Sequence, residues 1–176
     1  MNSSDTGNGF FYSQTHGKMQ IIEMIAKIRD FLDFDPNSEY VLVIGSDSQE
    51  KNGTLKGKDF VTLVTAVTVH RKGTGGIYFY KKKHLKGFKG PRANIRNKIY
   101  LETTASLTFA EKFVPLLKEN LNGHSPRLEI HVDVGEHGKS RDTIKEVVGM
   151  VTGCGYVAKT KPLSYGASKV ADKHTK

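Results

Sequence analysis

The pattern of apolar residues along the chain predicts its secondary structure. In residues 18–33, Ile21, Ile25, Ile28 and Leu32 recur at the spacing of one helical face. Residues 40–45 form an almost unbroken apolar run, which predicts a strand buried on both faces. Alternating valines predict a second strand over residues 60–70. Further strands are expected at 77–84, 128–134 and 156–159, and further helices at 93–121, 140–151 and 165–174.

This order of elements predicts the fold class. Three consecutive strands joined by tight turns, followed by strands that alternate with helices, indicate an α/β domain with a mixed five-stranded sheet. The order is β-β-β-α-β-α-β-α, with an extra N-terminal helix. Residues 1–17 are rich in Ser, Gly, Asn and Thr and are expected to be a loosely ordered lead-in. Residues 18–176 are expected to form a single domain.

Composition limits where such a protein works. No run of about 18 apolar residues could span a membrane. The first residues lack the apolar stretch of a secretory signal. Cys154 is the single cysteine, so no disulfide can form within the chain, which fits a reducing compartment. We therefore expect a cytoplasmic protein.

The net charge of +9 is concentrated in one segment. Residues 71–98 contain ten Lys and Arg residues and no Asp or Glu, and the rest of the chain is close to neutral. Aromatic residues are interleaved with these positive charges, as expected of a surface that binds a polyanion, nucleic acid first. The sequence leaves open whether this is DNA or RNA. The residues expected to contact the phosphates are Lys81, Lys82, Lys83, Lys86, Lys89 and Arg92.

Four acidic residues occupy unusual positions. Asp47 follows the buried strand of residues 40–45, and Glu102 lies on the apolar face of the helix at 93–121. Asp133 ends the strand at 128–134, and Asp172 lies in the last predicted helix. Because parallel strands end at the same edge of a sheet, Asp47 and Asp133 are expected side by side. Asp142 and Glu136 are alternatives to Asp172 as the fourth acid.

Such a group of carboxylates predicts a metal site. Carboxylates that lie close together repel one another, and a divalent cation relieves the repulsion. Oxygen ligands favour Mg²⁺ or Mn²⁺ over zinc. Two such ions could activate a water molecule and stabilise the leaving oxygen in phosphodiester hydrolysis. The pattern therefore predicts catalytic and metal-binding roles for Asp47, Glu102, Asp133 and Asp172.

The motifs around these acids resemble a known family. Ile44-Gly45-Ser46-Asp47-Ser48-Gln49, Glu102-Thr103, His131-Val132-Asp133-Val134-Gly135, Gly149-Met150-Val151, Lys161-Pro162 and Ala171-Asp172-Lys173 are similar to the bacterial YkuK-like family of the ribonuclease H-like superfamily. The resemblance begins at about residue 10 and covers nearly the whole remaining chain. It implies a ribonuclease H-like fold and a metal-dependent nuclease. It also implies that Asp47 bridges two metals and that Glu102 and Asp133 complete their shell.

Other readings of the sequence remain open. A non-catalytic nucleic-acid-binding or scaffold protein could use the same fold. The segment from Asp133 to Ser140 resembles a phosphate-binding loop, with Lys139 at the position of its lysine. The first position of that motif requires glycine, and here it is Asp133. His131 and His137 are candidate proton shuttles beside the predicted site. The sequence does not indicate an oligomeric state.

Overall fold

The structure is a computed structural model that describes residues 9–55, 58–86, 94–135 and 141–175. Its centre is a mixed sheet of seven strands in the order β2-β1-β5-β4-β3-β6-β7. Neighbouring strands are antiparallel except at the β3–β6 and β6–β7 pairs, which are parallel. The strands are β1 (Phe10–Ser13), β2 (Gly17–Gln20), β3 (Tyr40–Leu55), β4 (Lys58–Arg71), β5 (Gly75–Lys86), β6 (Arg127–His131) and β7 (Val157–Lys159).

The sheet has two more strands than the five predicted. The additional pair is the hairpin of β1 and β2, which falls largely within the predicted lead-in and joins the sheet where Tyr12 pairs with Tyr80. Each of these strands has only four residues, too few for an alternating pattern to be visible in the sequence. Phe11 and Met19 are nevertheless buried against the core. Gly17 has a φ of +72°, a conformation that glycine adopts without strain, at the turn of the hairpin.

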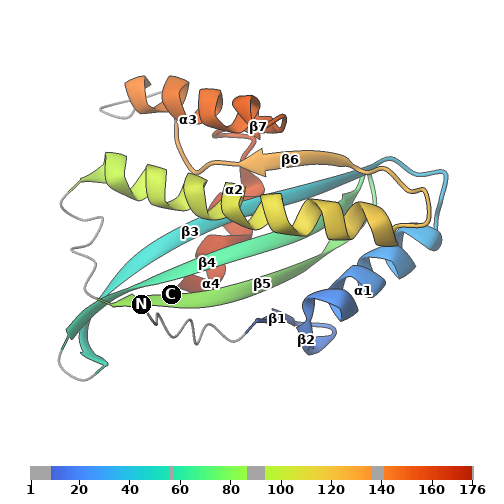
Figure 1. Cartoon of the computed structure of the whole chain (residues 1–176), viewed down its shortest axis with the longest axis horizontal. Helices are drawn as coiled ribbons and strands as arrows, with labels where there is room; N and C mark the ends of the chain where they lie inside the picture. The colour runs from blue at the N-terminus through green and yellow to red at the C-terminus, as the bar shows by residue number, and fades with distance from the viewer. Residues whose placement is uncertain (1–8, 56–57, 87–93, 136–140, 176) are drawn as a thin grey trace.

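Helices cover one face of the sheet, as Figure 1 shows. They are α1 (Ile21–Asp33), α2 (Ile95–Asn120) and α3 (Arg141–Gly153). The long helix α2 crosses the middle strands, and α1 lies next to it over the edge that carries β1 and β2. The buried faces of all three helices share one apolar core with inward side chains of β3, β4 and β6, among them Ile44, Val67 and Ile130.

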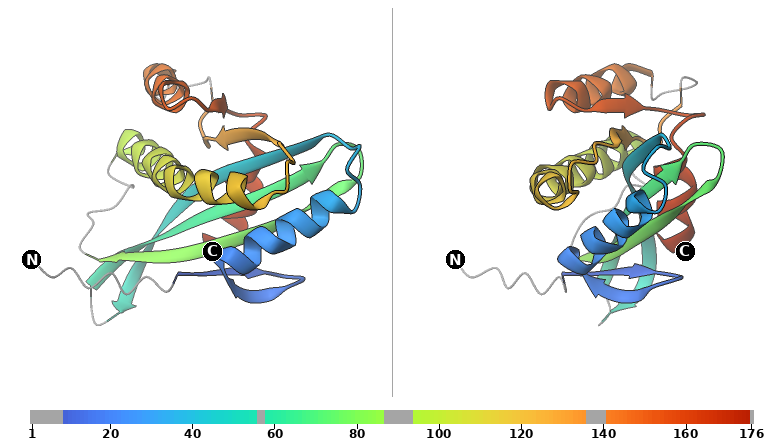
Figure 2. Two further views of the ribbon diagram at one scale, coloured as in Figure 1. Left: turned by 45° about the vertical axis from the view of Figure 1, so that its right-hand side comes forward. Right: turned by 90° about the vertical axis from the view of Figure 1, so that its right-hand side faces the viewer.

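The C-terminal segment covers part of the opposite face (Figure 2). It forms a π-helix, η2 (Gly166–Ala171), followed by a short helix, α4 (Asp172–Thr175). Ala171 packs there against Val64 and Ala66 in a second, smaller apolar cluster. At Gly166 a Cβ atom would lie only 2.4 Å from Cγ1 of Val43, so this close approach of the segment to the sheet requires glycine.

In the part of the chain that the structure describes, no helix is both long enough and apolar enough to cross a lipid bilayer.

Candidate functional site

The candidate site lies where two parallel strands stop pairing. The last pair between β3 and β6 joins Gly45 to His131. Beyond Gly45, strand β3 continues and pairs only with β4, on its other side, where Asp47 faces Val64. A crevice at the carboxyl end of parallel strands is the usual ligand site of an open α/β sheet. Asp47 lies two residues beyond this last pair, because β3 runs well past the strand end predicted at residue 45.

Polar pairing inside the protein explains why the strand continues. Ser46 shares a hydrogen bond of 3.0 Å with the Thr65 hydroxyl and accepts one of 2.9 Å from the Ser106 hydroxyl. Ser46, Ser48 and Thr65 are all buried. Because these groups satisfy one another, a polar stretch that looks like a strand end in the sequence remains inside the sheet.

Glu102 points inward from α2, as the sequence predicts. Its side chain is nearly inaccessible, and its Oε1 accepts hydrogen bonds of 2.7 Å from both the backbone N–H and the hydroxyl of Ser48. Asp47 is also buried and accepts a 2.8 Å hydrogen bond at Oδ2 from the Thr175 hydroxyl of α4. The pair is therefore assembled from β3, α2 and the C-terminal segment.

Lys98 lies between the two carboxylates. Its Nζ is 3.1 Å from Asp47 Oδ1, 3.1 Å from Glu102 Oε1 and 2.7 Å from the carbonyl oxygen of Ser48. Three oxygen atoms therefore converge on one cationic position. From the sequence, Lys98 is predicted only as the last member of the basic segment of residues 71–98. It lies four residues before Glu102 on the same helix, a spacing at which side chains meet.

Burial controls the ionisation of this cluster. The pKa of Glu102 is raised from 4.5 to about 7, mainly by burial and in part by the neighbouring Asp47, while Lys98 and the Ser48 hydrogen bond act in the opposite direction. Burial alone would lower the pKa of Lys98, but attraction by Glu102 and Asp47 outweighs it, so the pKa of Lys98 lies above its ordinary value. The ammonium is thus held firmly in its charged form, while Glu102 changes charge near neutral pH.

The two other predicted acids come from elements next to this pair. Asp133 follows β6, and its Oδ1 is 3.0 Å from Nζ of Lys161. Asp172 begins α4, and its carbonyl oxygen lies 2.8 Å from the same Thr175 hydroxyl that contacts Asp47. Among the described residues, no group of three or more His, Cys, Asp or Glu side chains is arranged to hold a metal ion. Glu136 and the side chain of Asp142 lie outside the described part of the structure.

His131 is buried, and both of its ring nitrogens have hydrogen-bond partners. Its Nε2 lies 3.1 Å from Glu129 Oε2, and its Nδ1 accepts a 3.1 Å hydrogen bond from the backbone N–H of Gly166. The Tyr165 ring packs perpendicular to the imidazole, with the ring centres 4.7 Å apart, and burial lowers the pKa of His131. With both nitrogens engaged and no access to solvent, His131 fixes η2 to the sheet. His137 and Lys139 lie outside the described residues.

The basic residues of β5 divide between the two faces of the sheet. Lys81 and Lys83 pair with Thr65 and Leu63 of β4 and share the face covered by α2. Lys82 points to the opposite face, where its Nζ is 5.9 Å from the centre of the Tyr80 ring. The side chain of Lys86, together with Lys89 and Arg92, lies outside the described part. The described lysines of β5 therefore do not form one continuous basic surface.

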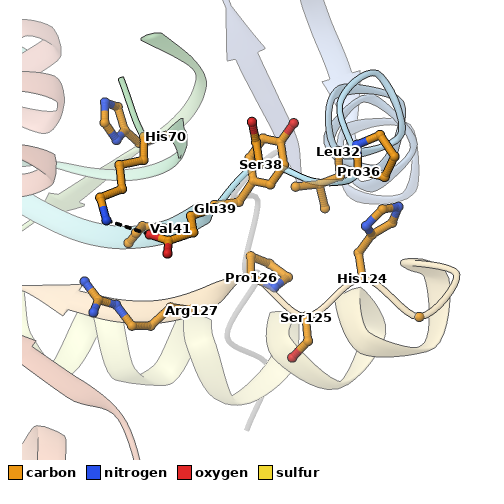
Figure 3. A pocket seen from close by; sticks show the side chains of 13 residues that line it. Leu32, Pro36, Ser38, Glu39, Val41, His70, His124, Ser125, Pro126 and Arg127 are labelled. Carbon is orange, nitrogen blue, oxygen red and sulfur yellow. Dashed lines mark hydrogen bonds and ion pairs between the residues drawn. The ribbon is translucent and has the colours of Figure 1, made fainter. Parts of the chain in front are cut away.

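A cavity of about 740 Å³ occupies the other end of β3, as Figure 3 shows. It is lined by residues such as Val41, His70 and Arg127. The Lys72 ammonium in its wall is bound at 2.7 Å to Glu39. Val41 and Asp47 are six residues apart on one strand, which places the cavity roughly 20 Å from the carboxylate pair. The two features are separate.

Comparison with known proteins agrees with the resemblance seen in the motifs. The family model described as ribonuclease H-like matches residues 23–176. A Bacillus subtilis (strain 168) protein with the name Uncharacterized protein YkuK is 33% identical over 175 residues, which cover 94% of this chain and 96% of the relative. No solved structure matches the chain.

Proposed function

The chain belongs to the ribonuclease H-like family, and on that basis we propose that it is a divalent-metal-dependent nuclease that hydrolyses phosphodiester bonds in nucleic acid. The observation that carries this proposal is the convergence of Asp47 Oδ1, Glu102 Oε1 and the Ser48 carbonyl oxygen on one position. Two carboxylates and a carbonyl are hard oxygen donors, which suit Mg²⁺ or Mn²⁺. The donor set therefore fits the ion that the family implies.

Each residue of the pair has a defined part in the proposal. Asp47 and Glu102 would hold the cation in the position that the Lys98 ammonium fills, and the two Ser48 hydrogen bonds would keep Glu102 correctly oriented. A bound divalent cation supplies an activated water and stabilises charge on the phosphate oxygens. Lys98, once displaced from the carboxylates, would be available to bind a substrate phosphate.

A second ion would need further ligands. Asp133 and Asp172 remain the proposed contributors, because Asp133 follows the neighbouring strand and the backbone carbonyl of Asp172 lies 2.8 Å from the Thr175 hydroxyl that contacts Asp47. The Asp133 carboxylate would have to leave Lys161, from which it is separated by only 3.0 Å. Since Lys161 is half exposed, that ion pair is a weak constraint.

A second candidate is a nucleic-acid-binding protein without catalysis. The observation that favours it is that Lys98 and Lys161 already form ion pairs with the carboxylates of Asp47, Glu102 and Asp133. A site whose negative charge is partly neutralised by its own lysines has less need of a metal. In this case the carboxylates, Lys98 and Lys161 stabilise the fold, and the other basic residues bind the nucleic acid.

Cleavage assays distinguish the two candidates. Wild type and Asp47→Asn are incubated in Mn²⁺ or in EDTA with labelled single-stranded DNA, duplex DNA, RNA, an RNA–DNA hybrid and a four-way junction. The nuclease predicts metal-dependent cleavage of at least one substrate by wild type and its loss in the variant. Binding by both proteins with no cleavage of any substrate would replace the nuclease by the binding protein.

A further inference from the structure

A groove with positively charged walls lies between α2 and the middle of the sheet. It has a volume of about 360 Å³ and is formed by β4 and β5 on one side and α2 on the other. Lys81 and Lys83 border it on the sheet side and Lys112 on the helix side. Of the residues in the described part of the chain that line the groove, none is acidic. Its charge is therefore complementary to a phosphate backbone.

The floor of this groove is apolar. Leu63 of β4, Leu85 of β5 and Leu101 of α2 line it, and Phe109 lies beneath, with the Lys81 ammonium 4.5 Å from its ring centre. Leu85 and Leu101 keep partial exposure to solvent. Such a floor offers an unpaired base a surface that releases water when it is covered. The bases of a duplex are stacked on one another and would leave it uncovered.

The groove leads to the carboxylate pair. Leu63 is the cross-strand partner of Ser48, the residue that donates two hydrogen bonds to Glu102. Leu101 directly precedes Glu102 and lies less than one helical turn after Lys98. A chain lying in the groove would therefore continue over the position where the proposed function places phosphodiester cleavage.

We infer that this groove is a binding site for single-stranded nucleic acid, with phosphates on Lys83 and Lys112 and an unpaired base on the apolar floor. The exposed hydroxyls of Thr104 and Thr108 on α2 add donors to the phosphate path. This inference rests on the proposed function in one respect, namely that it names the class of substrate for that site. It also separates Lys82, on the opposite face, from the substrate contacts.

Binding measured in EDTA tests the groove without cleavage. Fluorescence anisotropy is recorded with labelled single-stranded DNA, single-stranded RNA and a DNA duplex, each at several salt concentrations. The groove variant is Lys83→Gln with Lys112→Gln, and the matched control is Lys118→Gln with Lys145→Gln, which removes two exposed lysines elsewhere. A third variant, Thr104→Glu, places an acid in the groove at an exposed helical position.

The inference predicts that the groove variant binds single strands about tenfold more weakly. The slope of log K against log salt concentration should become shallower by about 1.4, the value for two phosphate contacts on a single strand. Thr104→Glu is expected to bind single strands still more weakly, and the control is expected to match wild type. Single-strand binding equal to that of the control, or equal losses for the duplex, would overturn the inference. Cleavage by wild type with no effect of the groove variant on binding would support the nuclease and refute the groove. Weaker binding by the groove variant with no cleavage by wild type would support the groove and refute the nuclease.

Discussion

The ionisation of Glu102 predicts how the stability of the protein depends on pH. In the folded protein burial raises the pKa of Glu102 from 4.5 to about 7, whereas in the unfolded chain it has the ordinary value. Between these two values the folded state binds a proton that the unfolded state has released. The free energy of unfolding therefore falls as pH rises from about 4.5 to about 7. A difference of this size corresponds to about 3 kcal/mol at most.

The variant Glu102→Gln isolates this contribution. Glutamine has the same shape and cannot titrate, so the falling part of the pH dependence should be absent from the variant. Urea denaturation at pH 5, 6, 7 and 7.5, followed by circular dichroism, measures the two curves. Titrating groups remote from Glu102 contribute equally to both curves and cancel in the difference.

A second variant serves as the control for this experiment. Glu146→Gln removes a partly exposed carboxylate that is 2.9 Å from Arg96 on the surface. An exposed ion pair contributes less than about 1 kcal/mol, so this variant should keep the pH dependence of wild type. Parallel curves for wild type and Glu102→Gln between pH 5 and 7 would refute the raised pKa of Glu102.

Two further substitutions test other parts of the structure. Lys98→Met leaves two buried carboxylates without their cation, so in the absence of metal the free energy of unfolding should fall by about 2 kcal/mol. The same variant should bind Mn²⁺ more tightly, because the ammonium no longer competes for the carboxylates. Urea denaturation and calorimetric titration measure both effects, and an unchanged Mn²⁺ affinity would show that Lys98 does not occupy the cation position. His131→Ala removes the partner of the Glu129 carboxylate and of the Gly166 N–H and should destabilise the protein by about 3 kcal/mol; a loss below about 1 kcal/mol in thermal unfolding would contradict the role of His131 in fixing η2.

The sequence predicts the parts of this fold that depend on long periodic segments. The three middle strands, the long helix and the inward position of Glu102 follow from apolar spacing, because a charged residue among Ile99, Ser106 and Phe109 is visible in the sequence itself. The hairpin of β1 and β2 is too short for such a signal. The extension of β3 past Gly45 depends on Ser46 and Ser48 finding partners on other elements, which only tertiary structure reveals.

In the candidate site, too, some features are visible in the local sequence and others depend on tertiary contacts. The position of each acid in its own element is local information, and it predicts the inward position of Glu102 and the place of Asp47 on a buried strand. The partners that balance them are not local: Lys98 contacts a strand fifty residues earlier in the sequence, and Thr175 reaches Asp47 from the far end of the chain. Lysines are common on helices, so a lysine that lies inside a site cannot be told from an exposed one by spacing alone.

Mn²⁺ binding is the most direct test of the central claim, that Asp47 and Glu102 hold a divalent cation. Isothermal titration calorimetry compares wild type with Asp47→Asn and with Glu146→Gln as control, after circular dichroism has shown that all three are folded. The account predicts that wild type and the control bind Mn²⁺ equally and that Asp47→Asn binds it at least about tenfold more weakly. No binding to wild type, or equal binding to Asp47→Asn, would contradict it.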